Sequence, residues 1–132
     1  MKILNQQIFE NKEAAALPGL MESGGLPALV SGLSGIHRVN LAAALYENLE
    51  LPMFVVCPDD SAAESFTRDL ESMLGRPVNT LYSRDFTFYP SLAASREAEQ
   101  KRLYVLNALR CGESPVTVAA VSALMQRAIP PQ

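Results

Sequence analysis

The sequence has few of the residues on which metal sites and membrane spans depend. Its only histidine is His37, and its two cysteines, Cys57 and Cys111, are far apart. These spacings form no set of metal ligands, so we expect no metal and two reduced, structural thiols. No apolar run is long enough to cross a bilayer, and the N-terminus lacks the apolar core of a signal peptide. We therefore expect a cytoplasmic protein without a membrane contact.

The chain also lacks an excess of basic residues. Eleven Lys and Arg stand against 14 Asp and Glu, which gives a formal net charge of −3. An autonomous nucleic-acid-binding domain normally carries a basic surface. Any contact with DNA is therefore expected to be local.

What is present indicates one α/β domain. The chain has 132 residues, of which 48% are hydrophobic, enough for one core. Strands are predicted at 26–31, 53–57, 77–82 and 116–120, alternating with helices at 36–49, 61–74, 95–110 and 123–128. This alternation predicts a parallel sheet of about four strands with helices on both faces. We expect a single domain, 1–132, in which a helical segment at 1–25, interrupted at Pro18, packs on the sheet.

Residues 27–42 follow the pattern of a buried strand, a glycine turn and the start of a helix. A phosphate-binding loop occupies this position in nucleotide-binding α/β domains. When the P-loop pattern G-x-x-x-x-G-K-[ST] is aligned from Gly32, its second glycine falls on His37, its lysine on Arg38 and its hydroxyl residue on Val39. A side chain at 37 restricts the backbone, an arginine replaces a compact ammonium, and valine offers no oxygen to Mg²⁺. We interpret the segment as a degenerate P-loop of an NTPase or helicase-type half-domain.

The vestigial nucleotide site predicted from this alignment consists of six residues: Gly32, Ser34, Gly35, His37, Arg38 and Val39. We expect no cofactor at this site. Backbone amides of the turn could still hold an anion. Ser34 does not fit a nucleophile elbow, because Ile36 stands where G-x-S-x-G requires glycine. The pattern G-x-G-x-x-G of dinucleotide sites is also absent.

Two further groups of residues remain open to a functional interpretation. Asp59 and Asp60 could hold Mg²⁺ or a ribose, although capping of the next helix explains them without a ligand, as does a capping box from Ser61 to Glu64. The loop 83–94 carries aromatic side chains that could stack on bases, dock a neighbouring module or pack on the domain's own core. With two arginines of the helix that follows, they form a candidate interaction surface: Phe86, Phe88, Tyr89, Arg96 and Arg102. Because the basic residues of that helix alternate with glutamates, we favour a solvated helix face, with Leu103, Leu106 and Leu109 turned inward.

Five segments, in this order, resemble the N-terminal module of bacterial transcription-repair coupling factors: 29–35 (LVSGLSG), 54–59 (FVVCPD), 85–90 (DFTFYP), 101–106 (KRLYVL) and 116–127 (VTVAAVSALMQR). The resemblance implies a fragment of a longer protein that is an ATP-dependent DNA translocase. It also implies likeness to the first helicase-type subdomain of the repair protein UvrB, with the ATP site lost. UvrB has a long aromatic hairpin between the positions of Tyr89 and Arg102, for which this loop is too short.

The resemblance further implies the partners of the chain. In the family, UvrA is recruited mainly by the next module, while RNA polymerase and DNA are bound by modules further along. We therefore expect a non-catalytic scaffold that supports UvrA recruitment in nucleotide excision repair. The alternatives are a nucleotide-hydrolysing domain that uses Arg38, and a weak single-strand DNA contact through the aromatic loop. Against hydrolysis, residues 119–122 offer no acidic magnesium motif after the strand.

Overall fold

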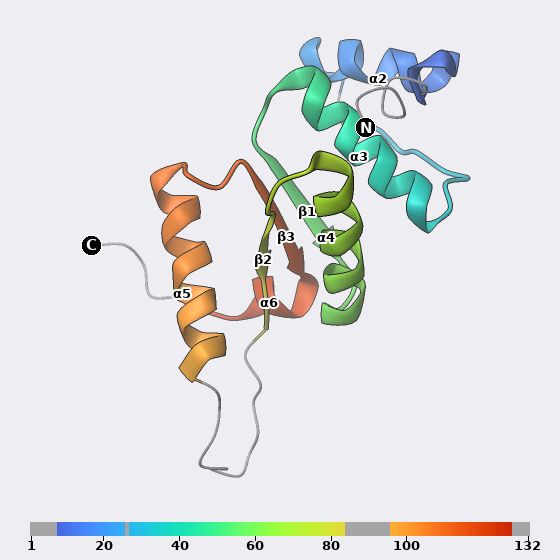
Figure 1. Cartoon of the computed structure of the whole chain (residues 1–132). Helices are drawn as coiled ribbons and strands as arrows, with labels where there is room; N and C mark the ends of the chain where they lie inside the picture. Colours follow the sequence, from blue (N-terminus) through green and yellow to red (C-terminus); the bar gives the residue numbers. More distant parts are fainter. Residues whose placement is uncertain (1–7, 26, 84–95, 128–132) are drawn as a thin grey trace. The chain divides into compact units, whose positions relative to one another are not determined.

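A computed structural model describes residues 8–25, 27–83 and 96–127 of the chain, with the side chains of Arg96 and Ala98 excluded. Their elements are a short 3₁₀ helix, five α-helices and three strands (Figure 1). In chain order they are η1 (Ile8–Glu10), α2 (Lys12–Glu22), α3 (Gly35–Leu49), β1 (Met53–Cys57), α4 (Asp60–Leu74), β2 (Asn79–Leu81), α5 (Arg96–Cys111), β3 (Val116–Ala120) and α6 (Val121–Met125). Their contacts divide the chain into two units, one formed by 1–51 with 68–76 and the other by 52–67 with 77–132.

The second unit contains a parallel sheet, as the sequence pattern predicted, but with three strands rather than four in the described ranges. Their order is β1-β3-β2, and β3 pairs in parallel with both neighbours. The connection through α4 leads from one edge to the other, and the connection through α5 returns to the centre. Right-handed crossovers that run in opposite directions place their helices on opposite faces. Figure 1 accordingly shows α5 on one side of the sheet and the first half of α4 on the other.

The core of this unit is centred on β3. All five of its residues are buried, and Val118 and Thr117 are among the largest fully buried side chains. The Thr117 hydroxyl shares a 2.6 Å hydrogen bond with the Ser114 hydroxyl, which also accepts one from the Asn79 amide at 2.7 Å. Buried polar groups require such partners, because an unsatisfied one costs free energy. This polar network therefore allows a threonine to occupy the middle of the sheet.

The first unit is helical. Helix α2 contacts η1 and α3, and its N-terminus is capped by Asn11, whose side chain accepts the Glu13 amide at 2.9 Å. The predicted interruption at Pro18 is wrong, because α2 continues through this residue to Glu22. Proline removes one backbone donor, and the neighbouring turns complete the helix around it. In the same unit the Arg76 guanidinium lies over the Tyr46 ring, 4.4 Å from its centroid, in a cation–π contact.

The first strand predicted from the sequence, at 26–31, is also wrong for the residues described. Residues 27–31 form no strand, and the side chain of Leu29 is 95% exposed. An apolar segment becomes a strand only where a neighbouring strand takes up its backbone hydrogen bonds. No described strand pairs with this segment, so a sheet that resembles a complete nucleotide-binding core is not confirmed.

Candidate functional site: the loop before helix α3

The candidate site is the loop that leads into α3, where the degenerate P-loop was predicted. Gly32 has a φ of +80°, a left-handed conformation that favours glycine because a side chain there is strained. Ser34 follows in an extended conformation at the N-cap, and α3 starts at Gly35. A glycine turn followed by a helix N-terminus is therefore present at the predicted place. The strand that should precede it is missing from the described residues.

The Ser34 hydroxyl does not cap the helix. It makes no hydrogen bond to a helix amide and instead lies 2.7 Å from Nδ1 of His37, at the exposed end of the loop. In a phosphate-binding loop the position of His37 is occupied by glycine, and the backbone amides face the ligand. In this chain the His37 imidazole and the Ser34 hydroxyl are instead hydrogen-bonded to each other.

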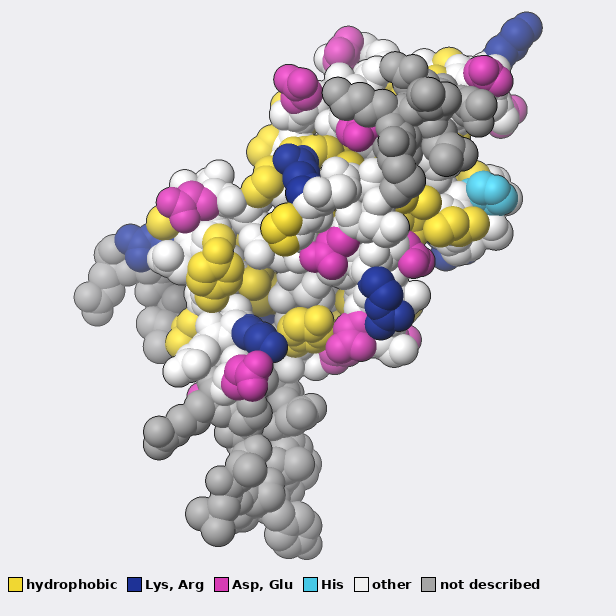
Figure 2. Space-filling model, viewed as in Figure 1, with side chains coloured by type: hydrophobic (Ala, Val, Ile, Leu, Met, Phe, Trp, Pro, Cys, Tyr) yellow, Lys and Arg dark blue, Asp and Glu magenta, His cyan; other side chains and the backbone are white. Residues whose placement is uncertain are grey.

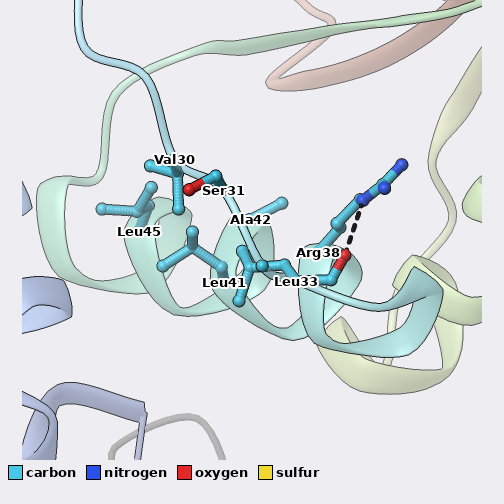
Figure 3. Close-up of a pocket in the computed structure, with 8 residues that line it drawn as sticks. Val30, Ser31, Leu33, Arg38, Leu41, Ala42 and Leu45 are labelled. Carbon is cyan, nitrogen blue, oxygen red and sulfur yellow. Dashed lines mark hydrogen bonds between the residues drawn. The ribbon is translucent and has the colours of Figure 1, made fainter.

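The Arg38 guanidinium also binds its own loop. Its Nε donates a 3.1 Å hydrogen bond to the carbonyl oxygen of Leu33 (dashed line in Figure 3). Figure 3 shows the end of this side chain pointing away from the side chains of Leu41 and Leu45. The positive charge is therefore held against a backbone carbonyl and stands apart from the apolar wall of the cavity beside it.

Val39 is a core residue of α3. Its side chain is only 2% exposed, and three other residues of the helix are also buried, namely Leu41, Ala43 and Ala44. At the position where a P-loop has a hydroxyl group that binds Mg²⁺, this chain has a buried valine side chain. Neither the chemistry nor the orientation of the side chain suits a metal ligand.

A cavity of about 330 Å³ lies against this loop. Most of its walls are apolar, and the residues around it are Val30, Ser31, Gly32, Leu33, Arg38, Leu41, Ala42 and Leu45. A triphosphate requires a cradle of backbone amides and a cation at its centre. The leucine and valine side chains supply neither, and the Arg38 guanidinium is bound to the Leu33 carbonyl, so the chemistry of this cavity does not favour a nucleotide phosphate.

The two aspartates after β1 take part in internal hydrogen bonds. Oδ1 of Asp59 accepts the Ala62 amide at 2.7 Å, so Asp59 caps α4. The carboxylate of Asp60 accepts the amide of Ser83 at 3.2 Å and also binds the Ser83 hydroxyl. The capping interpretation is thus confirmed for Asp59 but not for Asp60, and the cap is Asp59 rather than the predicted Ser61. In the described ranges no three metal-ligating side chains come together.

The cysteines are both free, with Cys57 buried and Cys111 exposed. Burial raises the pKa of the Cys57 thiol, and the nearby Asp59 carboxylate raises this pKa further. Both effects disfavour the thiolate, which is the nucleophilic form. Cys57 is therefore an inert structural thiol.

The second candidate site, the interaction surface, is described only in part. Phe86, Phe88, Tyr89 and the side chain of Arg96 lie outside the described residues. The prediction that Arg102 lies on a solvated face is wrong, since it is 4% exposed. Its two terminal nitrogens donate to the carbonyl oxygens of Tyr82 at 2.8 Å and Ala123 at 3.0 Å. Arg102 therefore connects the end of β2 and helix α6 with α5.

The side of α5 that faces inward also differs from the prediction. Arg102, Val105 and Ala108 are buried at intervals of three residues, while Leu103 is exposed. The spacing of three residues between Arg102, Val105 and Ala108 was a sequence signal that Arg102 is buried. The prediction placed Arg102 on the surface because the residue is charged. A long arginine can be buried where backbone carbonyls accept its hydrogen bonds.

Basic and acidic side chains are interspersed on the face of the molecule that Figure 2 shows. On the face shown in Figure 2, neither sign gathers into one patch among the residues drawn in colour. One exposed pair is Lys101 Nζ and Glu97 Oε1, 2.8 Å apart along α5. This pairing lowers the pKa of Glu97 and raises that of Lys101. In the part of the chain that the structure describes, no helix has the length and apolar character needed to cross a membrane.

Comparison with known proteins found no matching family model and no matching solved structure. Among curated proteins, the transcription-repair-coupling factor of Bacillus subtilis is 32% identical over 130 residues, which cover 94% of this chain. The chain spans 10% of the length of that relative. The resemblance predicted from the motifs is confirmed, and along nearly its whole length this chain is similar to a segment of a transcription-repair-coupling factor.

Proposed function

We propose that the chain is a non-catalytic scaffold and interaction module of a transcription-repair coupling factor, similar to the ATPase subdomain of UvrB but without its nucleotide site. The observation that carries this proposal is the burial of Val39, which is 2% exposed where a magnesium-binding hydroxyl would stand. A nucleotide triphosphate is hydrolysed by groups that bind Mg²⁺ and neutralise developing charge. A buried valine can do neither.

The other two altered positions support the same proposal. Arg38 donates to the Leu33 carbonyl within its own loop, and His37 pairs with Ser34. Both side chains would have to give up these hydrogen bonds before they could bind a phosphate. The function of the loop is then to connect the helices of the first unit, as a structural turn before α3.

The place of the module in repair follows from the resemblance. As a scaffold, it would support an adjoining module of the same polypeptide, through which UvrA is recruited. RNA polymerase and DNA would be bound by parts of the longer protein beyond these residues. This assignment agrees with the similarity to a coupling-factor segment and with the charge of −3, which does not favour an independent nucleic-acid contact.

A thermal-unfolding scan with and without millimolar Mg-ATP tests the loss of the nucleotide site. A ligand present at 100 times its dissociation constant would stabilise the native state by about 2.7 kcal/mol, a readily measured shift in Tm. We expect no shift, because no side chain at 37, 38 or 39 is available for Mg-ATP. Arg110→Ala, at an exposed position of α5, is the control variant.

A rise in Tm that Arg38→Ala abolishes and Arg110→Ala leaves in place would contradict the proposal. It would favour a nucleotide-hydrolysing domain in which Arg38 takes the part of the lysine. A rise that neither variant changes would locate nucleotide binding elsewhere in the chain, and would also contradict a module without a nucleotide site.

A further inference from the structure

Strand β1 forms one of the two edges of the parallel sheet, and among the described residues its outer side has no neighbouring strand. Strand β1 pairs with β3 on one side and lies at the end of the strand order, so no described strand pairs with its other side (Figure 1). Its sequence, MFVVC, contains no charge and no proline, and its pairing with β3 is continuous from Met53 to Cys57. Natural proteins usually protect such edges with lysine, proline or a bulge. β1 has none of these protections.

The backbone of β1 offers hydrogen bonds on this open side. Met53 donates its amide to the carbonyl of Pro115 at 2.8 Å, which turns the polar groups of Met53, Val55 and Cys57 toward β3. In a parallel ladder, the backbone N–H and C=O groups of the residues between them point to the opposite side of the strand. The N–H and C=O groups of Phe54 and Val56 therefore face outward, and they could pair with one further strand.

The side chains of the same two residues are exposed. Phe54 is 44% and Val56 is 51% exposed, whereas Cys57, on the opposite face of the strand, is buried. A parallel sheet is normally covered on both faces, and its strands are then apolar throughout. The composition of β1 is that of an inner strand, but its exposure is that of an edge strand.

The charges around β1 distinguish between two occupants of this edge. Glu50 precedes the strand, and Asp59 and Asp60 follow it. A second copy would bring no basic residue to either end of the strand, because residues 47–52 and 58–63 contain neither Lys nor Arg. A strand flanked by lysine or arginine would be attracted at both ends. The comparison adds that the matched relative is far longer, since this chain spans 10% of it.

We propose that the outer edge of β1 binds an extended, uncharged strand flanked by basic residues, supplied by another part of the same coupling-factor polypeptide. The inference rests on the proposed function in one respect, namely that the chain is a module of a longer protein. The added strand pairs with the backbone of Phe54 and Val56 and extends the sheet, as in β-strand addition. The segment that it brings with it covers their side chains.

Amide hydrogen exchange at residue resolution tests the proposal, measured on the 132-residue chain and on the longer polypeptide that contains it. In the short chain the Phe54 and Val56 amides exchange fast, while those of Met53 and Val55 are protected by β3. In the longer polypeptide we expect the Phe54 and Val56 amides to slow by roughly tenfold or more. Equal exchange in both would overturn the proposal, and so would protection in the short chain that grows with its concentration, which indicates a second copy.

Two variants of the longer polypeptide make the test specific. Val56→Pro removes an outward donor and leaves the bonds to β3 intact, so the Phe54 amide should lose its protection. Val56→Thr keeps the donor and is the matched control. If Val56→Pro also exposes the Val55 amide, Phe54→Lys replaces it as the edge-blocking variant. The Mg-ATP scan is independent of this experiment, so a failure of the proposed function would be recognised separately.

Discussion

At the scale of single residues, Arg102 is a residue that was predicted to lie on an interaction surface but has a structural role. Its guanidinium is buried and donates to the carbonyls of Tyr82 and Ala123. We expect Arg102→Met to lower the free energy of unfolding by about 2–4 kcal/mol, because it leaves the buried carbonyl of Ala123 and the part-buried carbonyl of Tyr82 without these donors. Urea denaturation measures the change. Arg110→Met, at an exposed position of the same helix, is the control, and an equal effect of both variants would contradict the structural role.

Single positions also show what the sequence could and could not reveal about the candidate site. The inability of the Val39 side chain to bind Mg²⁺ could be predicted, because a valine has no oxygen to offer as a ligand. The partners of His37 and Arg38 could not, since the hydrogen bonds to Ser34 and Leu33 depend on side-chain conformations that no spacing encodes. For Arg102 the charge predicted exposure, and only the nearby carbonyls explain its burial.

At the scale of elements, the start of α4 depends on one carboxylate. Oδ1 of Asp59 accepts the Ala62 amide at 2.7 Å, which satisfies one of the free donors in the first turn. We expect Asp59→Ala to reduce the free energy of unfolding by about 1 kcal/mol, within the range observed for helix caps. Asp59→Asn keeps the accepting oxygen and should lose much less. The capping role would be excluded if urea denaturation gave the same midpoint for Asp59→Ala and the unchanged protein.

The strands differ in how far the sequence determined them. Strands β1 and β3 begin and end at the predicted residues, 53–57 and 116–120, because each is a short apolar run bounded by turn residues. The run at 26–31 has a similar composition, yet its described residues form no strand. Hydrophobic pattern identifies a segment that is suited to a sheet, but a neighbouring strand decides whether it joins one. For the same reason the pattern could not show that β1 lies at an edge.

At the scale of the whole molecule, the two units differ in the number of groups that they bury. Strand β3 of the second unit is buried along its full length, whereas α2 of the first unit has no buried residue and includes Pro18. Opening free energies follow the burial of apolar contacts and of backbone hydrogen bonds. The amides of α2 are therefore expected to exchange fastest among the helices of more than one turn, and those of β3 slowest.

Replacement of Pro18 tests this difference within the first unit. Pro18→Ala restores a donor for the carbonyl four residues earlier and removes a ring that disfavours the helix interior by about 3 kcal/mol. The amides of α2 should then exchange at least roughly tenfold more slowly, while those of β3 keep their rates because they belong to the other unit. Ala16→Ser, at an exposed position of α2, is the control and should not slow exchange. If Pro18→Ala slowed exchange in β3 as much as in α2, the two units would open together, and the stability of the chain would have to be treated as one cooperative quantity.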